Sequence, residues 1–281
     1  MTASASSRPA APRLERAAVL GSGVMGATIA AHLANAGLEV LLLDIVPTAL
    51  SPEEQAAGLT LQDPRVRNRL AAAAVAGLER LKPAPLYLAA DAARIEPGNL
   101  EDHLPRLATC DWVVEVVVEN MAIKKALLAG KVAPHLKADA ILSTNTSGLS
   151  VNELADALPE GLRRRFLVTH FFNPPRYMRL VEVVSSRHTD PAVAAGMATF
   201  IRGRLGKGIV VGKDTPNFVA NRIGVFSICN AVQHMLALDL TVEEVDAVAG
   251  QATPAATWDR ASATCSNVTC HGAKVSEPGP F

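Results

Sequence analysis

The sequence predicts an α/β protein: a Rossmann-type doubly wound sheet followed by the start of an all-helical C-terminal domain. The first observation is a glycine-rich turn, Gly21–Gly26, between a short apolar run at 17–20 and an apolar helical stretch at 25–36. The second is that several apolar runs are continuous rather than alternating, which is typical of parallel strands covered on both faces. The third is a purely helical pattern after residue 213.

The elements follow one another in a βα rhythm. Residues 51–82 have helix-forming composition interrupted by proline and glycine, and we expect a helical excursion there. Strands are expected at 17–20, 40–43, 112–118, 140–143, 166–172, 179–184 and 208–211. Helices are expected at 25–36, 121–132, 191–205, 216–236 and 241–248.

These elements divide the chain into four parts. Residues 1–16 are an Ala-, Ser- and Pro-rich leader that we expect to be disordered, with a transit peptide as the alternative. Residues 17–213 form the predicted nucleotide-binding domain, and 214–250 a partial helical domain. Residues 251–281 are an atypical tail with no clear periodicity.

Composition excludes several classes of protein. The chain has 281 residues, of which 49% are hydrophobic, and its 27 basic residues balance its 27 acidic ones. Zero net charge argues against nucleic acid and anionic membranes as partners. No apolar run approaches the roughly 20 residues of a membrane span. We therefore expect a soluble, cytoplasmic protein.

The four cysteines do not suggest a disulfide framework in a chain of this length. Cys110 and Cys229 lie in apolar stretches, and we expect both to be buried. Cys265, Cys270 and His271 have no second ligand pair at zinc-like spacing, so no metal site is expected.

The glycine-rich turn has the context of a dinucleotide-binding site. It follows a strand and opens a helix, and Asp44 comes 18 residues after Gly26, at the end of the next strand. A carboxylate there would bind the adenosine ribose hydroxyls and repel a 2′-phosphate, which favours NAD over NADP. A structural glycine turn is the alternative. The predicted cofactor-binding residues of this turn are Gly21, Ser22, Gly23, Val24, Met25 and Gly26.

Polar residues follow two further strands. Glu119 comes at the end of the apolar run 112–118, where ligands bind in open α/β sheets, and Lys124 falls in the next helix. Glu115, inside the run, is open to interpretation as a packing residue. Ser147 belongs to a hydroxyl-rich stretch, 143–148, which fits either a ligand contact or a helix N-cap.

His170 and Glu182 form a candidate acid–base pair. They lie on two predicted strands joined through Pro174-Pro175, so a hairpin would bring them together. A carboxylate on one imidazole nitrogen raises the basicity of the other, as proton abstraction from an alcohol requires. Asn173 either contacts the ligand or caps the turn. Asn221, expected on the second turn of the helix at 216–236, either reaches a cleft or faces water.

Five blocks follow one another along the chain: the glycine turn, the stretches 112–124 and 143–148, the stretch 170–175 with Glu182, and the stretch 213–224. In this order they resemble the 3-hydroxyacyl-CoA dehydrogenase family over roughly residues 16–250. The stretches 170–175 and 213–224 are the most specific. In particular, the chain is similar to the dehydrogenase portion of bacterial multifunctional fatty-acid oxidation proteins. The resemblance implies NAD-dependent oxidation of (3S)-3-hydroxyacyl-CoA to 3-oxoacyl-CoA, with an acyl-CoA substrate.

The resemblance also implies roles for individual residues. His170 matches the catalytic base, Glu182 its acidic partner, Ser147 a contact to substrate and nicotinamide, and Asn221 a polar helper at the reacting carbonyl. Glu119, Lys124 and Asn173 match cofactor contacts. The chain departs from the family at Asn217, where the family has glycine, and from residue 251 onward, where a further helical domain is expected.

Two alternative functions follow from these departures and from the glycine turn. A truncated NAD-binding module would bind cofactor without turnover. Another β-hydroxyacid dehydrogenase would share the turn, although the HFFNPP stretch does not fit that group. The C-terminal helices are also a possible homodimer surface.

Overall fold

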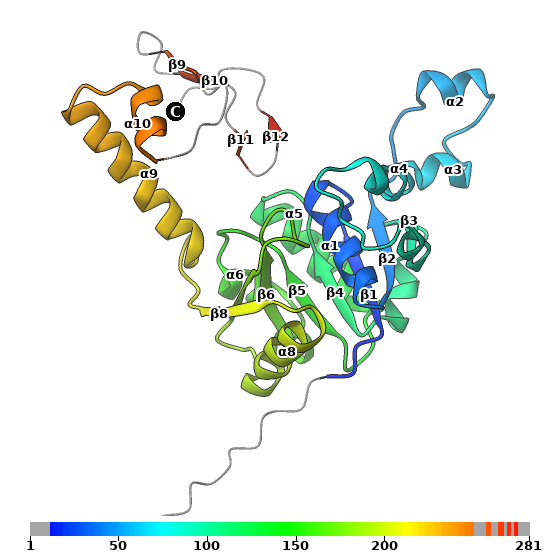
Figure 1. Ribbon diagram of the computed structural model, residues 1–281. Coiled ribbons are helices and arrows are strands. Elements are labelled where there is room, and N and C mark those ends of the chain that lie inside the picture. The colour runs from blue at the N-terminus through cyan, green and yellow to red at the C-terminus, as the bar shows by residue number, and fades with distance from the viewer. Residues whose placement is uncertain (1–11, 250–256, 260–263, 267–268, 271–272, 275–281) are drawn as a thin grey trace, which may run out of the picture. The chain divides into compact units, whose positions relative to one another are not determined.

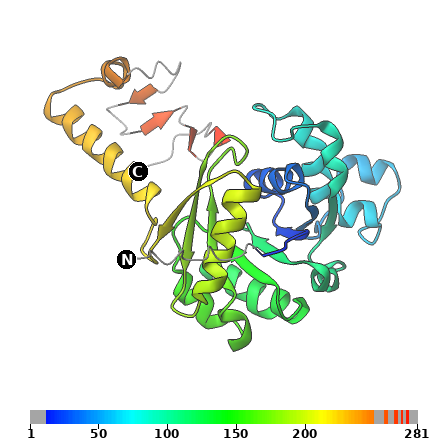
Figure 2. The same ribbon diagram turned by 60° about the horizontal axis from the view of Figure 1, so that its bottom comes forward.

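The computed structural model describes residues 12–249, 257–259, 264–266, 269–270 and 273–274. Its centre is an eight-stranded sheet in the order β3-β2-β1-β4-β5-β6-β7-β8, with helices on both faces (Figures 1 and 2). The Rossmann-type fold class predicted from the sequence is confirmed. The strands are β1 (Arg16–Leu20), β2 (Glu39–Asp44), β3 (Ile95–Asn99), β4 (Trp112–Glu115), β5 (Ile141–Thr144), β6 (Phe166–Phe171), β7 (Leu180–Ser185) and β8 (Gly208–Gly212).

Helices connect these strands much as the sequence predicts. They are α1 (Val24–Asn35), α2 (Pro52–Ala56), α3 (Pro64–Arg67), α4 (Arg69–Gly77), α5 (Met121–Lys125), α6 (Val151–Ala157), α7 (Glu160–Arg163) and α8 (Pro191–Arg204). Five shorter helical segments complete this part: Leu78–Arg80, Ala89–Arg94, Leu104–Thr109, Ala126–Val132, which is a π-helix, and Ala133–His135. The excursion expected at 51–82 is therefore helical.

Two apolar layers hold the helices to the sheet. On one face α1 and α8 pack against alternate strand residues such as Val19, Val114 and Val183. On the other face the helices after β4 and β5 pack against their neighbours, such as Leu20 and Val113. Because adjacent strand residues point to opposite faces, both faces are apolar, which explains the continuous apolar runs.

The sheet differs from the sequence prediction at three strands. The edge strand β3 was not predicted, because its sequence Ile-Glu-Pro-Gly-Asn lacks an apolar run and contains proline, which edge strands tolerate. Strand β4 ends at Glu115 rather than at residue 118, so Glu119 lies in the loop beyond it. The continuous apolar runs indicate parallel strands, and β7 departs from that pattern because it runs antiparallel to β6, as the turn expected at Pro174-Pro175 allows.

The first C-terminal helix starts later than expected. The sequence predicted a helix from residue 216, but α9 (Ala220–Ala237) begins four residues farther on. Asn217 and Phe218 have positive φ angles of 63° and 45°, which no helix accommodates. Asn221 therefore lies on the first turn of α9 rather than on the second. The helix α10 (Val242–Ala249) begins as predicted, with a capping box between Thr241 and Glu244.

The described chain divides into two compact units, with the boundary between Phe218 and Val219. Short strands of the second unit are β9 (Thr257–Asp259), β10 (Thr264–Ser266), β11 (Thr269–Cys270) and β12 (Ala273–Lys274). Most of the predicted leader, and His271 of the cysteine–histidine group, lie outside the described residues. No helix of the described residues is long and apolar enough to cross a membrane.

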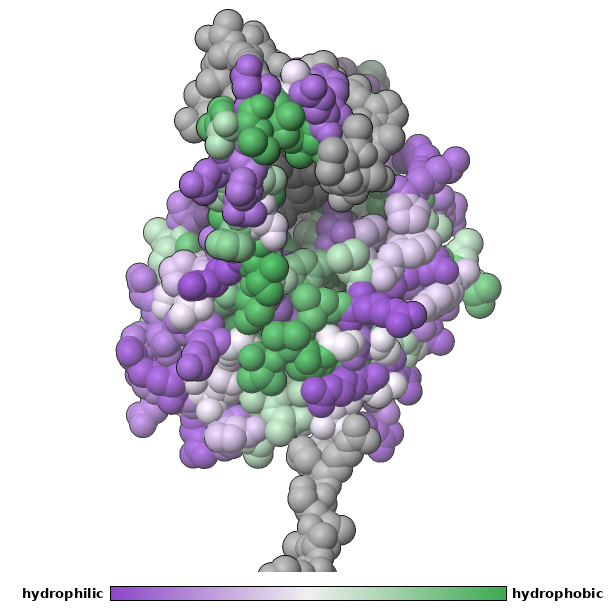
Figure 3. All heavy atoms as spheres, turned by 60° about the vertical axis from the view of Figure 1, so that its left-hand side comes forward, coloured by the Kyte–Doolittle hydropathy of each residue, from purple (hydrophilic) through white to green (hydrophobic). Residues whose placement is uncertain are grey.

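Cys110 and Cys229 differ in burial. Cys110 is buried as expected, and burial raises the pKa of its thiol to about 11. Cys229 is exposed, which contradicts the expectation of a buried residue. It lies on α9, whose apolar side chains are largely uncovered among the described residues. In Figure 3, green marks the apolar side chains that are visible at the surface. The exposed apolar residues of α9 are Ile223, Val225, Phe226, Ile228, Val232 and Leu236.

His32 is a buried histidine on α1. Its ring packs edge-on against Phe171, and neither ring nitrogen has a hydrogen-bond partner of standard geometry among the described residues. Burial, together with the nearby charge of Lys207, lowers the pKa of His32 to about 4, although the Leu205 backbone opposes the shift. His32 is therefore neutral in the folded protein at neutral pH.

We expect His32 to make the fold sensitive to acid. Between pH 6.5 and 4 the unfolded chain binds a proton at this residue and the folded protein does not, so stability falls as the pH falls through this window. The full effect corresponds to about 3 kcal/mol. Denaturant unfolding of the wild type and of His32→Leu as a function of pH measures it, and the variant should show a shallower loss.

The exposed His234 provides the matched control, as His234→Leu should keep the wild-type pH dependence. An equal loss of stability on acidification in the wild type and in His32→Leu would contradict the assignment.

Candidate active site

The glycine turn lies between β1 and α1, as predicted. Gly21 has φ +103°, and a Cβ there would lie 2.6 Å from the Val116 carbonyl oxygen. A Cβ on Gly26 would lie only 1.8 Å from the Gly21 oxygen, so this position requires glycine. Gly23, in contrast, has no atom within 4 Å of its would-be Cβ. Two glycines are therefore needed for the turn itself, and the third leaves open space beside the backbone.

That open space lies at the start of α1. Gly23 is the N-cap, no side chain caps the helix, and its first turn contains no acidic residue. The N-terminus of a helix favours anions through its unpaired N–H groups and its dipole. Val24 is exposed and Met25 half-buried at this end. This arrangement fits the pyrophosphate of a dinucleotide.

Asp44 ends β2 beside this turn. One oxygen of its carboxylate accepts hydrogen bonds from the Ser22 N–H (2.6 Å) and the Ser22 hydroxyl (2.5 Å), and the other accepts from the Ile45 N–H (2.7 Å). The turn and the carboxylate are thus in direct contact. This is the placement that ribose recognition beside a pyrophosphate requires.

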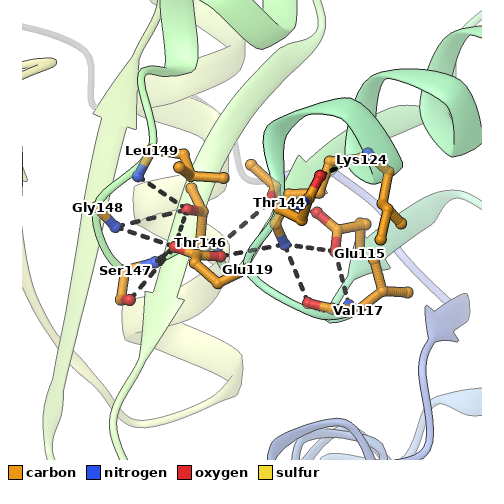
Figure 4. A network of polar contacts seen from close by, with 11 residues as sticks. Glu115, Val117, Glu119, Lys124, Thr144, Thr146, Ser147, Gly148 and Leu149 are labelled. Carbon is orange, nitrogen blue, oxygen red and sulfur yellow. Dashed lines mark hydrogen bonds and ion pairs between the residues drawn. The ribbon is translucent and has the colours of Figure 1, made fainter.

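Glu119 and Lys124 belong to a polar network at the ends of β4 and β5 (Figure 4). Lys124 is 1% exposed and forms an ion pair with Glu115 (2.7 Å) and a longer one with Glu119 (3.4 Å). Burial would raise the pKa of Glu119, but the hydrogen bond from Thr146 and the charge of Lys124 outweigh it and lower that pKa. Glu119 is thus held as a carboxylate.

Ser147 lies in the loop after β5 and joins the same network. Its backbone N–H donates to Glu119 (2.9 Å), and its hydroxyl lies 3.4 Å from the same oxygen. Thr146 also donates its hydroxyl to Glu119. The sequence interpretation left a helix N-cap open for this stretch, and it is Ser150, not Ser147, that caps α6.

His170 and Glu182 are brought together by the antiparallel pairing of β6 and β7. The two residues are direct register partners, and the His170 Nδ1 lies 2.7 Å from a Glu182 carboxylate oxygen. The Glu182 side chain has no exposed surface, and that of His170 is 7% exposed. The Phe172 ring lies 4.5 Å from the imidazole and the Phe218 ring 6.1 Å from it, centre to centre. A buried carboxylate thus orients an imidazole among aromatic rings.

The loop between these strands is held by cations. The buried Lys207 donates to the carbonyls of Pro175 and Met178, the latter at 2.8 Å, and burial lowers the pKa of Lys207 to about 8. Arg176 donates to the carbonyls of Ala84 and Leu86 at 2.6 and 2.8 Å. Asn173, a predicted cofactor contact, opens this loop, and its bond to Pro174 is cis.

Asp214 and Asn217 fasten the next segment to the loop after β5. The Asp214 carboxylate accepts from Ser150 and from the first N–H groups of α6, at 2.8 to 2.9 Å. Asn217 stands where the family has glycine and has φ +63°, which asparagine tolerates better than most residues. The departure from the family pattern is therefore compatible with the same backbone. Asn221 belongs to the second unit, and its position relative to His170 is not defined.

Several residues of this site were missed or left undecided by the sequence analysis. Glu115 was open to interpretation as a packing residue, yet it accepts three hydrogen bonds. Asn145 holds the end of β6, because its side-chain oxygen accepts from the Phe171 N–H (2.8 Å). The role of Lys207 could not be predicted, because the sequence shows only a charged residue next to an apolar strand. A carboxylate inside an apolar run was the signal for Glu115, since such a group needs buried donors.

Comparisons with known proteins identify the family. Residues 16–215 match the family model described as 3-hydroxyacyl-CoA dehydrogenase, NAD binding domain. The chain belongs to this family. The match confirms the resemblance read from the motifs and confirms NAD as the cofactor of this domain. It covers the sheet and every site residue of the first unit.

Named relatives are similar over most of this chain. A probable 3-hydroxyacyl-CoA dehydrogenase of Bacillus subtilis (strain 168) is 50% identical over 237 residues, which are 84% of this chain and 30% of that protein. A protein of the same name from Deinococcus radiodurans is 46% identical over 241 residues, 85% of this chain and 65% of that protein. The chain thus spans between about a third and two thirds of these relatives.

Solved structures share the fold. FadB2 of M. tuberculosis is 31% identical with a TM-score of 0.66, covering 86% of this chain and 80% of that chain. The (S)-3-hydroxybutyryl-CoA dehydrogenase PaaH1 of Ralstonia eutropha is 27% identical with a TM-score of 0.66, covering 86% and 79%.

The three glycines of the turn should respond differently to alanine. In Gly23→Ala the methyl group enters open space, so we expect a folded protein of wild-type thermal stability. The same methyl group would intrude where the pyrophosphate approaches, and NAD⁺ affinity should fall by about tenfold or more, the cost of a lost charged hydrogen bond. Calorimetric titration with NAD⁺ measures this.

Gly26→Ala is the matched comparison. Its methyl group meets the Gly21 carbonyl, so we expect a loss of about 1–3 kcal/mol of stability, as for other overpacked positions. Unchanged NAD⁺ affinity in Gly23→Ala would argue against the proposed path of the pyrophosphate.

Proposed function

We propose that this chain carries the catalytic site for NAD-dependent oxidation of (3S)-3-hydroxyacyl-CoA to 3-oxoacyl-CoA in fatty-acid β-oxidation. The observation that carries the proposal is the buried pair of His170 and Glu182, 2.7 Å apart. The glycine turn and Asp44 support an NAD site in the same domain. The names of the relatives, 3-hydroxyacyl-CoA dehydrogenases and fatty acid oxidation proteins, support the substrate class.

The reaction removes a proton from the 3-hydroxyl group and a hydride from C3. NAD⁺ supplies the hydride acceptor. The proton passes to His170 Nε2, because Nδ1 faces Glu182 and is not available. The buried carboxylate favours the tautomer protonated at Nδ1 and stabilises the imidazolium that forms when Nε2 takes the proton. Phe172 and Phe218 limit the access of water to the imidazole.

The remaining predicted residues complete this proposal. Ser147 and Asn221 hold the substrate oxygen, with Ser147 also at the nicotinamide. Glu119, Lys124 and Asn173 serve the cofactor, as do Val24 and Met25 at the start of α1. The hydrogen bond from the Ser147 N–H to Glu119, which joins the loops after β5 and β4, supports their joint role.

The proposal extends to where the protein acts and how it assembles. We infer that the protein acts in the cytoplasm and takes acyl-CoA substrates. The exposed apolar side chains of α9 support a homodimer through the C-terminal helices, because uncovered apolar patches mark contact surfaces.

A second candidate function is an NAD-binding module without turnover. The observation that favours it is the extent of the match: this chain corresponds to 30% and 65% of the two bacterial relatives. Such a module would retain the glycine turn, Asp44 and NAD⁺ affinity, and would form no NADH from 3-hydroxyacyl-CoA.

Replacing the base should abolish turnover and keep cofactor binding. We expect His170→Ala to lower the rate of NADH formation from 3-hydroxybutyryl-CoA by about 10²–10⁴-fold, the usual contribution of a general base. Glu182→Gln should also lower kcat, since an amide does not stabilise the imidazolium. NADH absorbance gives the rates, and calorimetry should give wild-type affinity for NAD⁺ in the His170 variant.

His188, which is half-buried and pairs with Asp156, serves as the control, and His188→Ala should keep full activity. Turnover by His170→Ala at the wild-type rate would refute the assignment of the base. NAD⁺ binding by the wild type without any NADH formation would favour the binding module instead.

A further inference from the structure

Glu115 and Lys124 form an ion pair in the interior, and Glu115 has no role in the function proposed above. Glu115 ends β4 and has no exposed side-chain surface, and Lys124 on α5 is 1% exposed. Isolated charges at such positions would be very costly, so each depends on its partners. The pair lies between the ends of β4 and β5, beside the loop that contains Ser147 (Figure 4).

Three oxygen atoms surround the Lys124 ammonium. It donates hydrogen bonds to a Glu115 oxygen at 2.7 Å and to the Val117 carbonyl at 3.2 Å, and it forms an ion pair with a Glu119 oxygen at 3.4 Å. A direct hydrogen bond from Lys124 to the cofactor would therefore compete with these contacts.

Glu115 holds Lys124 in this arrangement. The oxygen that binds Lys124 also accepts from the Val117 N–H at 2.6 Å, and the other oxygen accepts from the Thr144 hydroxyl at 2.6 Å. Three donors from β5, α5 and the loop after β4 thus meet on one buried carboxylate. The geometry leaves Glu115 little freedom to move.

Glu119 is the point at which the network reaches the surface. Its side chain is 41% exposed, and one of its oxygens accepts hydrogen bonds from the Ser147 N–H at 2.9 Å and the Gly148 N–H at 3.3 Å. The position of this carboxylate therefore shapes the backbone of the loop after β5. The buried Lys124 ammonium attracts the other oxygen of Glu119.

We propose that Glu115 is a positioning residue for the nicotinamide end of the cofactor site. It holds Lys124, Lys124 holds Glu119, and Glu119 holds the turn at Ser147 and Gly148. Lys124 then acts on the cofactor through Glu119 rather than by direct contact. This inference rests on the proposed cofactor site and adds Glu115, which acts behind it, to the residues of that site.

Neutralising Glu115 has a definite consequence in this network. Glu119 becomes the only carboxylate partner of Lys124, and the ammonium moves toward it. Glu119 is drawn inward and its contacts to Ser147 and Gly148 lengthen. Asp44 and the glycine turn share no hydrogen bond with this network among the described residues, so we expect the larger disturbance in the loop after β5.

The test is the binding of two ligands to Glu115→Gln, measured by calorimetry. NAD⁺ reports on the whole site, and ADP-ribose, which lacks nicotinamide, reports on the glycine turn and Asp44 alone. We expect NAD⁺ to bind about tenfold more weakly, within the range for coupled neighbouring residues. The affinity for ADP-ribose should equal that of the wild type, whereas general damage to the fold would weaken both.

Lys124→Met and the double variant Glu115→Gln/Lys124→Met complete a cycle. The double variant has no unpaired buried charge, so it keeps the test valid if Glu115→Gln alone does not fold. The proposal predicts that NAD⁺ affinity in the double variant is no weaker than in Lys124→Met, because both residues act through Glu119. Lys125→Met, on the same helix but paired with Glu153 at the surface, is the control and should bind both ligands normally.

Wild-type affinity for NAD⁺ in the double variant would overturn the proposal. A second combination of results would also overturn it: NAD⁺ binds Glu115→Gln as tightly as the wild type or more tightly, and binds Lys124→Met more weakly. Direct contact between Lys124 and the cofactor would produce this combination. Failure of the wild type to bind NAD⁺ or ADP-ribose would instead refute the cofactor site itself.

Discussion

The reversal of strand direction between β6 and β7 places the reactive pair of this protein. Glu182 has no exposed surface, and a carboxylate in that environment requires donors. The antiparallel register sets His170 directly opposite it, and the short connection of residues 172–179 permits no other pairing direction. Lys207 and Arg176 hold that connection, and Asn145 holds the end of β6. The imidazole is therefore positioned by the sheet as well as by its side-chain partner.

The parallel part of the sheet brings the other groups to one edge. Strands β1, β4 and β5 are neighbours, so their carboxyl ends place the glycine turn, Glu115 and the Ser147 loop side by side. Gly21 packs on the Val116 backbone, which ties the turn to the loop after β4. Glu115 then joins that loop to β5 and α5. In our account the parallel strands build the cofactor side of the site, and the antiparallel pair supplies the base.

Much of this arrangement could be predicted from the sequence, because local signals were strong. The glycine turn, with Asp44 at the end of the next strand, predicts a dinucleotide-binding site. The two strands on either side of Pro174-Pro175 predict the contact of His170 with Glu182. Other features depend on tertiary contacts. Strand β3 has no apolar run, and α9 starts late because Asn217 and Phe218 take positive φ angles that proline and threonine signals do not reveal. The roles of Glu115 and Lys207 depend on backbone carbonyls and hydroxyls that only the folded chain brings near them.

The central claim is that Glu182 orients His170 so that Nε2 accepts the substrate proton. Nitrogen NMR of labelled histidine, at a pH where the imidazole is neutral, reports which ring nitrogen carries the proton. We predict that His170 is protonated at Nδ1 in the wild type and that Glu182→Gln changes this tautomer balance. Protonation at Nε2 in the wild type, or the same balance in both proteins, would contradict the account.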